Sequence, residues 1–283
     1  MSLPNTSGVT RARTTTPALA CDAHIHIADP AFPPSVPGTK LAPQATAADY
    51  TLVRERFGTT RTVIVQAKAY GTDNACLLDA IARLAPAKGV AVIHPTISDA
   101  ELKRLDAGGV RGIRFSVWNP ADAVATIDML PPLAPRIAAL GWHAQIHMSG
   151  DQLVAHADML AALPCDIVID HMGRLPPAAG GAHPAFTAIC RLLDNGRTWL
   201  KVSGAYLNTN SGPPAYADAT AVAQAFVRAA PQRLVWGSDW PHVTEVDKPD
   251  TALLFDLIAT WAGDEPTRRR ILVDNPAKLY GFS

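Results

Sequence analysis

Short apolar, β-branched segments alternate with longer amphipathic segments along nearly the whole chain. This alternation constrains the fold more than any other feature. Most of the short segments are almost continuous in apolar residues, as expected for parallel strands that are covered on both faces. The predicted strands are residues 18–27, 61–67, 89–95, 110–116, 142–148, 165–171, 198–204 and 233–239. Eight strand–helix alternations with short connections predict a distorted (β/α)8 TIM barrel of the α/β class.

The segments between the predicted strands have the start and stop signals of helices. Thr46 is a candidate N-cap for a helix that ends near Gly58. Ser98 lies three residues before Glu101, which is a capping-box spacing. The predicted helical segments are 46–58, 72–85, 98–109, 123–140, 151–163, 184–195, 217–230, 250–262 and 265–273. Long loops rich in Pro and Gly are expected at 29–45, 174–184 and 209–216.

Length and composition narrow the class of protein further. A chain of 283 residues is near the upper limit for one hydrophobic core. We predict a flexible N-terminal arm over residues 1–18, without the apolar region of a signal peptide, and one barrel domain over residues 19–283. The formal net charge of zero argues against nucleic acid or an anionic membrane as partner. Four scattered cysteines predict a reducing, cytoplasmic location, and a homo-oligomer stays open.

Polar residues that can bind a metal end several of the predicted strands. His24 and His26 are two residues apart at the end of the first strand, and this period places both on one face. His147 ends the fifth strand, His171 the sixth, and Asp239 the eighth. Because the carboxyl ends of barrel strands meet around one mouth, two imidazoles, a third imidazole and a carboxylate form a set suited to a divalent metal. His171 is a further ligand or a donor to the substrate.

Asp239 has the strongest claim to a chemical role. Its carboxylate follows a strand of large apolar residues, where an unpaired charge is costly to bury. Beside an activated water it can act as general base. Asp170 is expected to point away from the face of His171, and neither Asp170 nor Asp22 is assigned to the chemistry. His143 lies deeper in its strand than the site and is expected to have a core role.

Seven stretches of the sequence together resemble the amidohydrolase superfamily. They are DAHIHI, GVRGIRF, DHMGR, KVSGAY, YAD, WGSDWPH and DNPAKLYGF, and the resemblance runs from about residue 19 to the end. The chain is most similar to the branch that contains 2-pyrone-4,6-dicarboxylate hydrolases and sugar-lactone or muconolactone hydrolases. The resemblance implies a barrel with its site at the carboxyl ends of the strands, and hydrolysis as the reaction. It implies Asp239 as the base that activates water, with His24, His26 and His171 around the substrate or the metal.

The same resemblance implies residues that bind the substrate. Arg114 would hold a carboxylate, because a guanidinium binds a carboxylate through two hydrogen bonds. Lys201 lies in a strand that is otherwise apolar and therefore needs a partner. Further candidates for contact with the substrate are Lys68, Tyr70, Thr72, Trp118, Tyr206, Tyr216 and His242.

Two departures from the pyrone enzymes bear on the substrate. Those enzymes work without a metal and lack a histidine at the end of the fifth strand, where this chain has His147. They also use arginines after the fourth strand for a second carboxylate, where this chain has Trp118 and Asn119. We therefore expect a lactone with one acidic group, such as a muconolactone or a sugar-acid lactone, rather than a planar dicarboxylate.

The resulting hypothesis is a metal-dependent lactonase. One divalent ion, expected to be zinc, is held by His24, His26, His147 and Asp239, and activates the water that attacks the ring carbonyl. His171 stabilises the oxyanion, and Arg114 holds the substrate. The alternatives are a metal-dependent decarboxylase of an unsaturated or aromatic acid, and a metal-free lactonase or lactone isomerase. A binding protein without catalytic activity is the alternative from another class.

Overall fold

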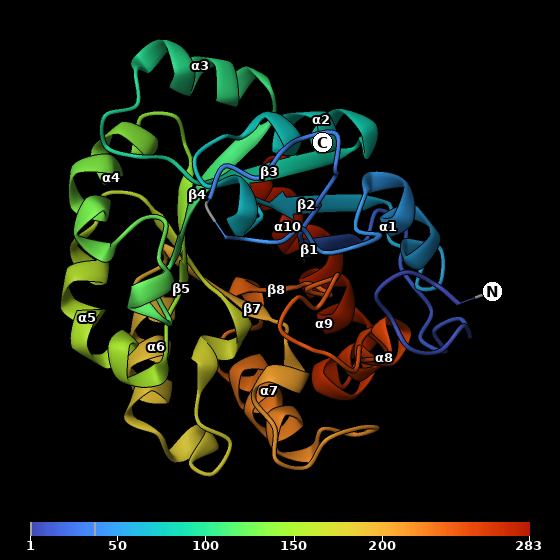
Figure 1. Ribbon diagram of the computed structural model, residues 1–283. Helices are drawn as coiled ribbons and strands as arrows, with labels where there is room; N and C mark the ends of the chain where they lie inside the picture. Colours follow the sequence, from blue (N-terminus) through green and yellow to red (C-terminus); the bar gives the residue numbers. More distant parts are fainter. Residues whose placement is uncertain (1, 37) are drawn as a thin grey trace.

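Eight parallel strands, in the order in which they occur in the chain, form one sheet in the computed structural model, which describes residues 2–36 and 38–283 (Figure 1). The strands are β1 (Cys21–Ile25), β2 (Arg61–Val65), β3 (Ala87–Ala91), β4 (Val110–Ser116), β5 (His143–His147), β6 (Asp166–Ile169), β7 (Thr198–Val202) and β8 (Leu234–Trp236). The sheet closes where the amide of Asp239 donates to the His24 carbonyl and the amide of His26 donates to the Trp240 carbonyl, each over 2.8 Å. The predicted α/β barrel is confirmed.

The helices lie around the outside of the barrel, except the last one, which lies behind its centre in the view of Figure 1. They are α1 (Ala47–Arg54), α2 (Ala75–Arg83), α3 (Asp99–Ala107), α4 (Leu130–Ala138), α5 (Gly150–Ala162), α6 (Pro184–Asp194), α7 (Ala217–Ala229), α8 (Thr251–Ala262), α9 (Glu265–Arg269) and α10 (Asn275–Tyr280). Thr46 and Ser98 cap α1 and α3 as predicted, but the capping box expected for Ser98 is incomplete, because the Glu101 carboxylate pairs with Arg104 instead. Helix α4 begins later than predicted, at Leu130, because prolines occupy its first turn.

The interior of the barrel has an apolar half and a polar half. Strands β1, β2, β3 and β8 contribute a small apolar cluster, which α10 completes with Tyr280. Strands β4, β5 and β7 place polar side chains at their inward positions instead. These polar residues are Arg114, His143, Gln145 and Lys201. Buried polar side chains therefore line one half of the barrel interior, and the apolar cluster fills the other half.

The first strand does not keep a regular alternation. Its pairing with β2 shifts between Asp22 and Ile25. Cys21 belongs to the interior cluster, while the carboxylate of Asp22 accepts hydrogen bonds from the Tyr50 hydroxyl and the Ser238 amide. After the shift, His24 faces inward. The irregularity explains how Asp22 and His24, two residues apart, point to different sides of the strand.

The N-terminal segment lies beside α1 and α8 (Figure 1). The Arg56 side chain, which is almost fully buried, donates to the carbonyl of Thr10, the hydroxyl of Thr6 and the carboxylate of Asp250. The Trp240 indole donates to the Pro4 carbonyl over 3.0 Å. The segment thus contacts the chain directly after the catalytic candidate Asp239. In the described part of the chain, no helix has the length and apolarity needed to cross a membrane.

Candidate active site

A cavity of about 580 Å³ lies at the carboxyl ends of the strands. Its wall combines the loops after β1 and β2, the ends of β4 and β5, and the loops after β6, β7 and β8. The polar, charged and aromatic residues that line it include His26, Lys40, Lys68, Arg114, Ser116, Trp118, His147, His171, Arg174, Tyr206, Asp239 and Glu245. This is the place where a (β/α)8 barrel holds its active site. The loop over 29–45, one of the three expected long loops, lines the cavity with Thr39 to Ala42.

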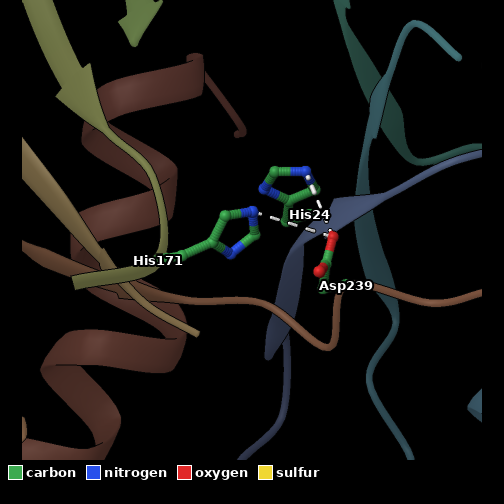
Figure 2. Close-up of side chains that lie close together, drawn as sticks. All are labelled: His24, His171 and Asp239. Carbon is green, nitrogen blue, oxygen red and sulfur yellow. Dashed lines mark ion pairs between the residues drawn. The ribbon is translucent and has the colours of Figure 1, made fainter. Parts of the chain in front are cut away.

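At the base of this cavity, imidazoles surround the carboxylate of Asp239 (Figure 2). The Nε2 atoms of His24 and His26 lie 3.5 Å and 3.6 Å from Oδ1 of Asp239. Nε2 of His171 lies 3.9 Å from the same oxygen. The two closing hydrogen bonds of the barrel hold His24 and Asp239 together, so strands from opposite ends of the chain build the centre.

His171 reaches this centre because the chain leaves strand β6 directly before it. The strand ends at Ile169, and His171 has a φ of 50°, in the left-handed region. This turn redirects the imidazole, whose Nδ1 lies 3.0 Å from the Ser203 hydroxyl. Gly204 makes the approach possible, because a Cβ there would lie 3.0 Å from Nδ1 of His171.

The expectation that Asp170 points away from the site was wrong. Asp170 keeps the inward position of its strand, and it is His171 that leaves the strand geometry. The Asp170 carboxylate is fully buried, with Oδ1 3.4 Å from Nδ1 of His24. Asp170 therefore belongs to the layer directly beneath the imidazoles.

Lys201 is the partner of Asp170 in this layer. Its Nζ lies 3.5 Å from Oδ1 of Asp170 and donates to Oε1 of Gln145 over 2.7 Å. Burial lowers the pKa of Lys201 to about 8, while the charge of Asp170 opposes the shift. On the other side, Nε of Arg114 lies 3.5 Å from Oδ2 of Asp170. The sequence prediction that Lys201 needs a partner is confirmed.

The hydroxyl of Tyr206 orients Asp239 by donating to its Oδ2 over 2.6 Å. Burial opposes ionisation of Asp239, but the neighbouring imidazole of His171 holds its pKa well below the ordinary value. Burial also raises the pKa of the Tyr206 phenol, and the charge of Asp239 raises it further. At neutral pH the pair is therefore a phenol that donates to a carboxylate, and Asp239 is in the ionised form that a general base requires.

The donor set fits a divalent metal. Single ligand atoms of His24, His171 and Asp239 lie within 4.8 Å of one another. Nε2 of His26 is 3.3 Å from Nε2 of His24 and adds a fourth donor. Burial lowers the pKa of His24 and of His171, which favours the neutral imidazole that binds metals. Nitrogen and carboxylate donors of this kind suit zinc and several other first-row ions.

His147 stands beside this group rather than within it. Its ring lies edge-to-face with that of His171, with 5.3 Å between the centroids. Nδ1 is 3.0 Å from the hydroxyl of Ser116, and Nε2 is buried without a hydrogen-bond partner among the described residues. Of the residues in the predicted ligand set, the structure thus brings together His24, His26 and Asp239. His171, which the sequence left as either a further ligand or a donor to the substrate, lies with them.

The residues predicted to bind substrate fall into two groups. Arg114, Lys68, Trp118 and Tyr206 line the cavity. Four others lie elsewhere: Thr72 borders a neighbouring groove, Tyr70 donates to the Asp29 carbonyl, Tyr216 is buried before α7, and His242 lies 3.1 Å from the Thr251 hydroxyl. The rings of His242 and Tyr206 pack edge-to-face with 5.0 Å between their centroids, so His242 contacts the site through Tyr206.

Several cavity residues were not predicted. Arg174 stacks its guanidinium on the Trp118 ring, 4.9 Å from the centroid. Its position three residues after His171, in DHMGR, is the signal that points to it. Together with Lys40, Lys68 and Arg114 it gives the wall four cations, against the carboxylates of Asp239 and Glu245. The cavity is therefore suited to an anionic ligand.

Comparisons with known proteins show the family and the fold to which this chain is similar. A family model described as amidohydrolase matches residues 21–282. A 2-pyrone-4,6-dicarboxylate hydrolase of Comamonas testosteroni is 37% identical over 93% of this chain and 90% of its own length. A 4-sulfomuconolactone hydrolase of Rhizobium radiobacter is 35% identical over 94% of this chain and 91% of its own length. An apo crystal structure from Agrobacterium tumefaciens, 29% identical, superimposes with a TM-score of 0.89 over 97% of this chain and 98% of that one.

Proposed function

Because the chain belongs to the amidohydrolase family, we propose that it hydrolyses a lactone that carries an acidic group, with water attacking the ring carbonyl. The observation that carries the proposal is the buried, ionised Asp239 at the base of a cavity lined by four cations. The names of the two curated relatives support the lactone class of substrate. The free cysteines support a cytoplasmic location.

The cations of the wall bind and orient the substrate. Nε of Arg114 faces Asp170 at 3.5 Å, while the residue also lines the cavity, so the terminal nitrogens of its guanidinium can donate to a carboxylate or sulfonate. Arg174, held against Trp118, supplies a second positive charge on the same side. Fixing the acidic group in this way places the ring carbonyl over the imidazoles and the carboxylate.

The residues at the base of the cavity move the protons. Asp239 accepts a proton from the attacking water, while Tyr206 holds the carboxylate in place. In the tautomer of His147 that accepts at Nδ1 from the Ser116 hydroxyl, 3.0 Å away, the proton is on Nε2, from which it can be donated to the carbonyl oxygen as that oxygen gains charge. The new bond joins the water oxygen to the carbonyl carbon, and the ring C–O bond breaks. Asp239 then returns the proton to the leaving ring oxygen, which gives a hydroxy acid.

The residues that would hold a metal are His24, His171 and Asp239, with His26 as a fourth donor. Zinc bound there would act as a Lewis acid and lower the pKa of a bound water to about 7. This assignment places His171 among the ligands and leaves His147 to contact the substrate.

A panel of lactones with and without a carboxylate or sulfonate tests the function. We expect turnover of the acidic lactones, and a fall in kcat of about 10²–10⁴-fold for Asp239→Asn, the range typical of a lost general base. Asp166→Asn is a matched control, since Asp166 lies at the start of the same barrel's β6 and accepts from the Trp199 indole, away from the cavity. A wild-type chain that turns over no acidic lactone would refute the proposal.

Isotope labelling separates hydrolysis from isomerisation. In water enriched in ¹⁸O, hydrolysis places one solvent oxygen in the new carboxylate. A product without the label would show that the ring is rearranged without attack by water, and would replace the hydrolase with a lactone isomerase.

A further inference from the structure

One ring nitrogen of His24 faces two competing partners. Nδ1 lies 3.3 Å from Nζ of Lys201, a donor, and 3.4 Å from Oδ1 of Asp170, an acceptor. All three groups are fully buried, so water does not substitute for either partner. A neutral imidazole carries one proton, and the partner of Nδ1 therefore decides whether that proton is on Nδ1 or on Nε2.

The hydrogen bonds of the structure assign the proton to Nε2. Nδ1 of His26 lies 2.9 Å from the carbonyl of Val65, which can only accept, so this nitrogen carries a proton. Nε2 of a neutral His26 is then an acceptor, and its neighbour at 3.3 Å is Nε2 of His24. His24 therefore donates from Nε2 and accepts at Nδ1 from Lys201. A continuous chain of donors runs from Lys201 through both imidazoles to Val65.

A metal needs the opposite arrangement at His24. The lone pair of Nε2 must face the ion, so the proton must lie on Nδ1 and needs an acceptor there. Oδ1 of Asp170 is placed to accept it, and it is buried without a hydrogen-bond partner among the described residues. We propose that Asp170 and Lys201 are positioning residues that select the tautomer of His24, with Asp170 required for tight metal binding and Lys201 favouring the tautomer that cannot bind. The inference rests on the metal assignment of the proposed function.

Asp170→Asn is an informative variant because Gln145 fixes the orientation of the new amide. Oε1 of Gln145 accepts from Lys201 over 2.7 Å, so its Nε2 faces Oδ2 of Asp170 at 3.0 Å. An asparagine would turn its oxygen toward this donor and its NH₂ toward His24. It would then offer Nδ1 a donor in place of an acceptor, as Lys201 does.

The test is the zinc affinity of chelator-treated protein, measured by competition with a chromophoric chelator. Asp170→Asn should weaken zinc binding about 10- to 100-fold, the usual effect of losing the group that orients a ligand. Lys201→Met should bind zinc at least as tightly as wild type, and Asp166→Asn should match wild type. A folded Asp170→Asn protein that binds zinc as tightly as wild type would overturn the inference.

Nitrogen NMR of protein labelled in its histidine rings gives a second readout that does not depend on turnover or on Lys201→Met folding. The His24 signals, assigned with His24→Gln, should report Nε2–H after chelator treatment and Nδ1–H after zinc addition. Nδ1–H before zinc addition contradicts the inference. A wild-type chain that binds no zinc also overturns it, but continued lactone hydrolysis by that chain would leave the proposed function standing.

Discussion

His143 should make the protein less stable in acid, and replacing it should remove that loss. The ring is 1% exposed in the barrel floor, against Tyr280, and both ring nitrogens lack a hydrogen-bond partner among the described residues. Burial lowers the pKa of His143 to about 3, with the charge of Lys201 adding to the shift. In the unfolded chain the pKa is about 6.5, so the unfolded state takes up a proton first as the pH falls.

The size of the effect follows from these two pKa values. This contribution to stability is fully present above about pH 6.5 and is lost as the pH falls toward 3. The unfolded-state pKa of about 6.5 lies about 1.5 units above pH 5. At 1.36 kcal/mol per unit, the loss in unfolding free energy at pH 5 is about 2 kcal/mol.

Urea unfolding of wild type and His143→Leu at pH 8 and pH 5 measures this contribution. Leucine has a similar volume and does not titrate. Other buried histidines act equally in both proteins, so wild type should lose about 2 kcal/mol more than the variant between the two pH values. If both proteins lost the same stability, the reasoning about buried His143 would be refuted.

Three further substitutions probe the site and its supports. Gly237→Ala should reduce activity strongly and lower the Tm, because the Cβ of the alanine would lie 2.6 Å from Cβ of His24. Wild-type activity in this variant would show that β1 and β8 can move apart to make room. Arg56→Met should lower the free energy of unfolding in urea by about 2–3 kcal/mol, since it leaves Asp250 without its charged partner, and should expose the N-terminal arm to trypsin; unchanged trypsin resistance would contradict this role. Arg114→Lys should raise KM for acidic lactones at least tenfold with little change for neutral ones, and an equal effect on both would remove Arg114 from substrate binding.

The strands and most helices could be predicted because local patterns determine them. Continuous apolar runs marked the eight strands, and Thr46 and Ser98 marked two helix starts, as the structure confirms. The C-terminal end was harder. The chain passes from α9 through a π-helical turn at Arg270–Asp274 into α10, so the helical region continues beyond the predicted residue 273.

The site was less accessible to pattern reasoning, because two breaks in regular geometry decide which side chains meet. The shift in β1 separates Asp22 from His24, and the positive φ of His171 turns its imidazole inward beside Asp170. A prediction that alternates side chains between the two faces of a strand includes neither of these breaks. Arg174 was missed for a related reason, since it also has a positive φ and reaches the cavity from an irregular turn. The flexibility of residues 1–18 stays a prediction, which the trypsin experiment tests.

The junction of β1 and β8, the closing seam of the barrel, links the thermal stability of the protein to its catalytic activity. Among the described residues, β1 and β8 are joined through the backbone of His24, His26, Asp239 and Trp240 rather than by a ladder between the strands themselves. Any fluctuation that parts this seam also separates the carboxylate from its imidazoles. On heating, catalytic activity should therefore be lost at a lower temperature than helical structure. Residual activity would then report local opening at the seam before the protein unfolds.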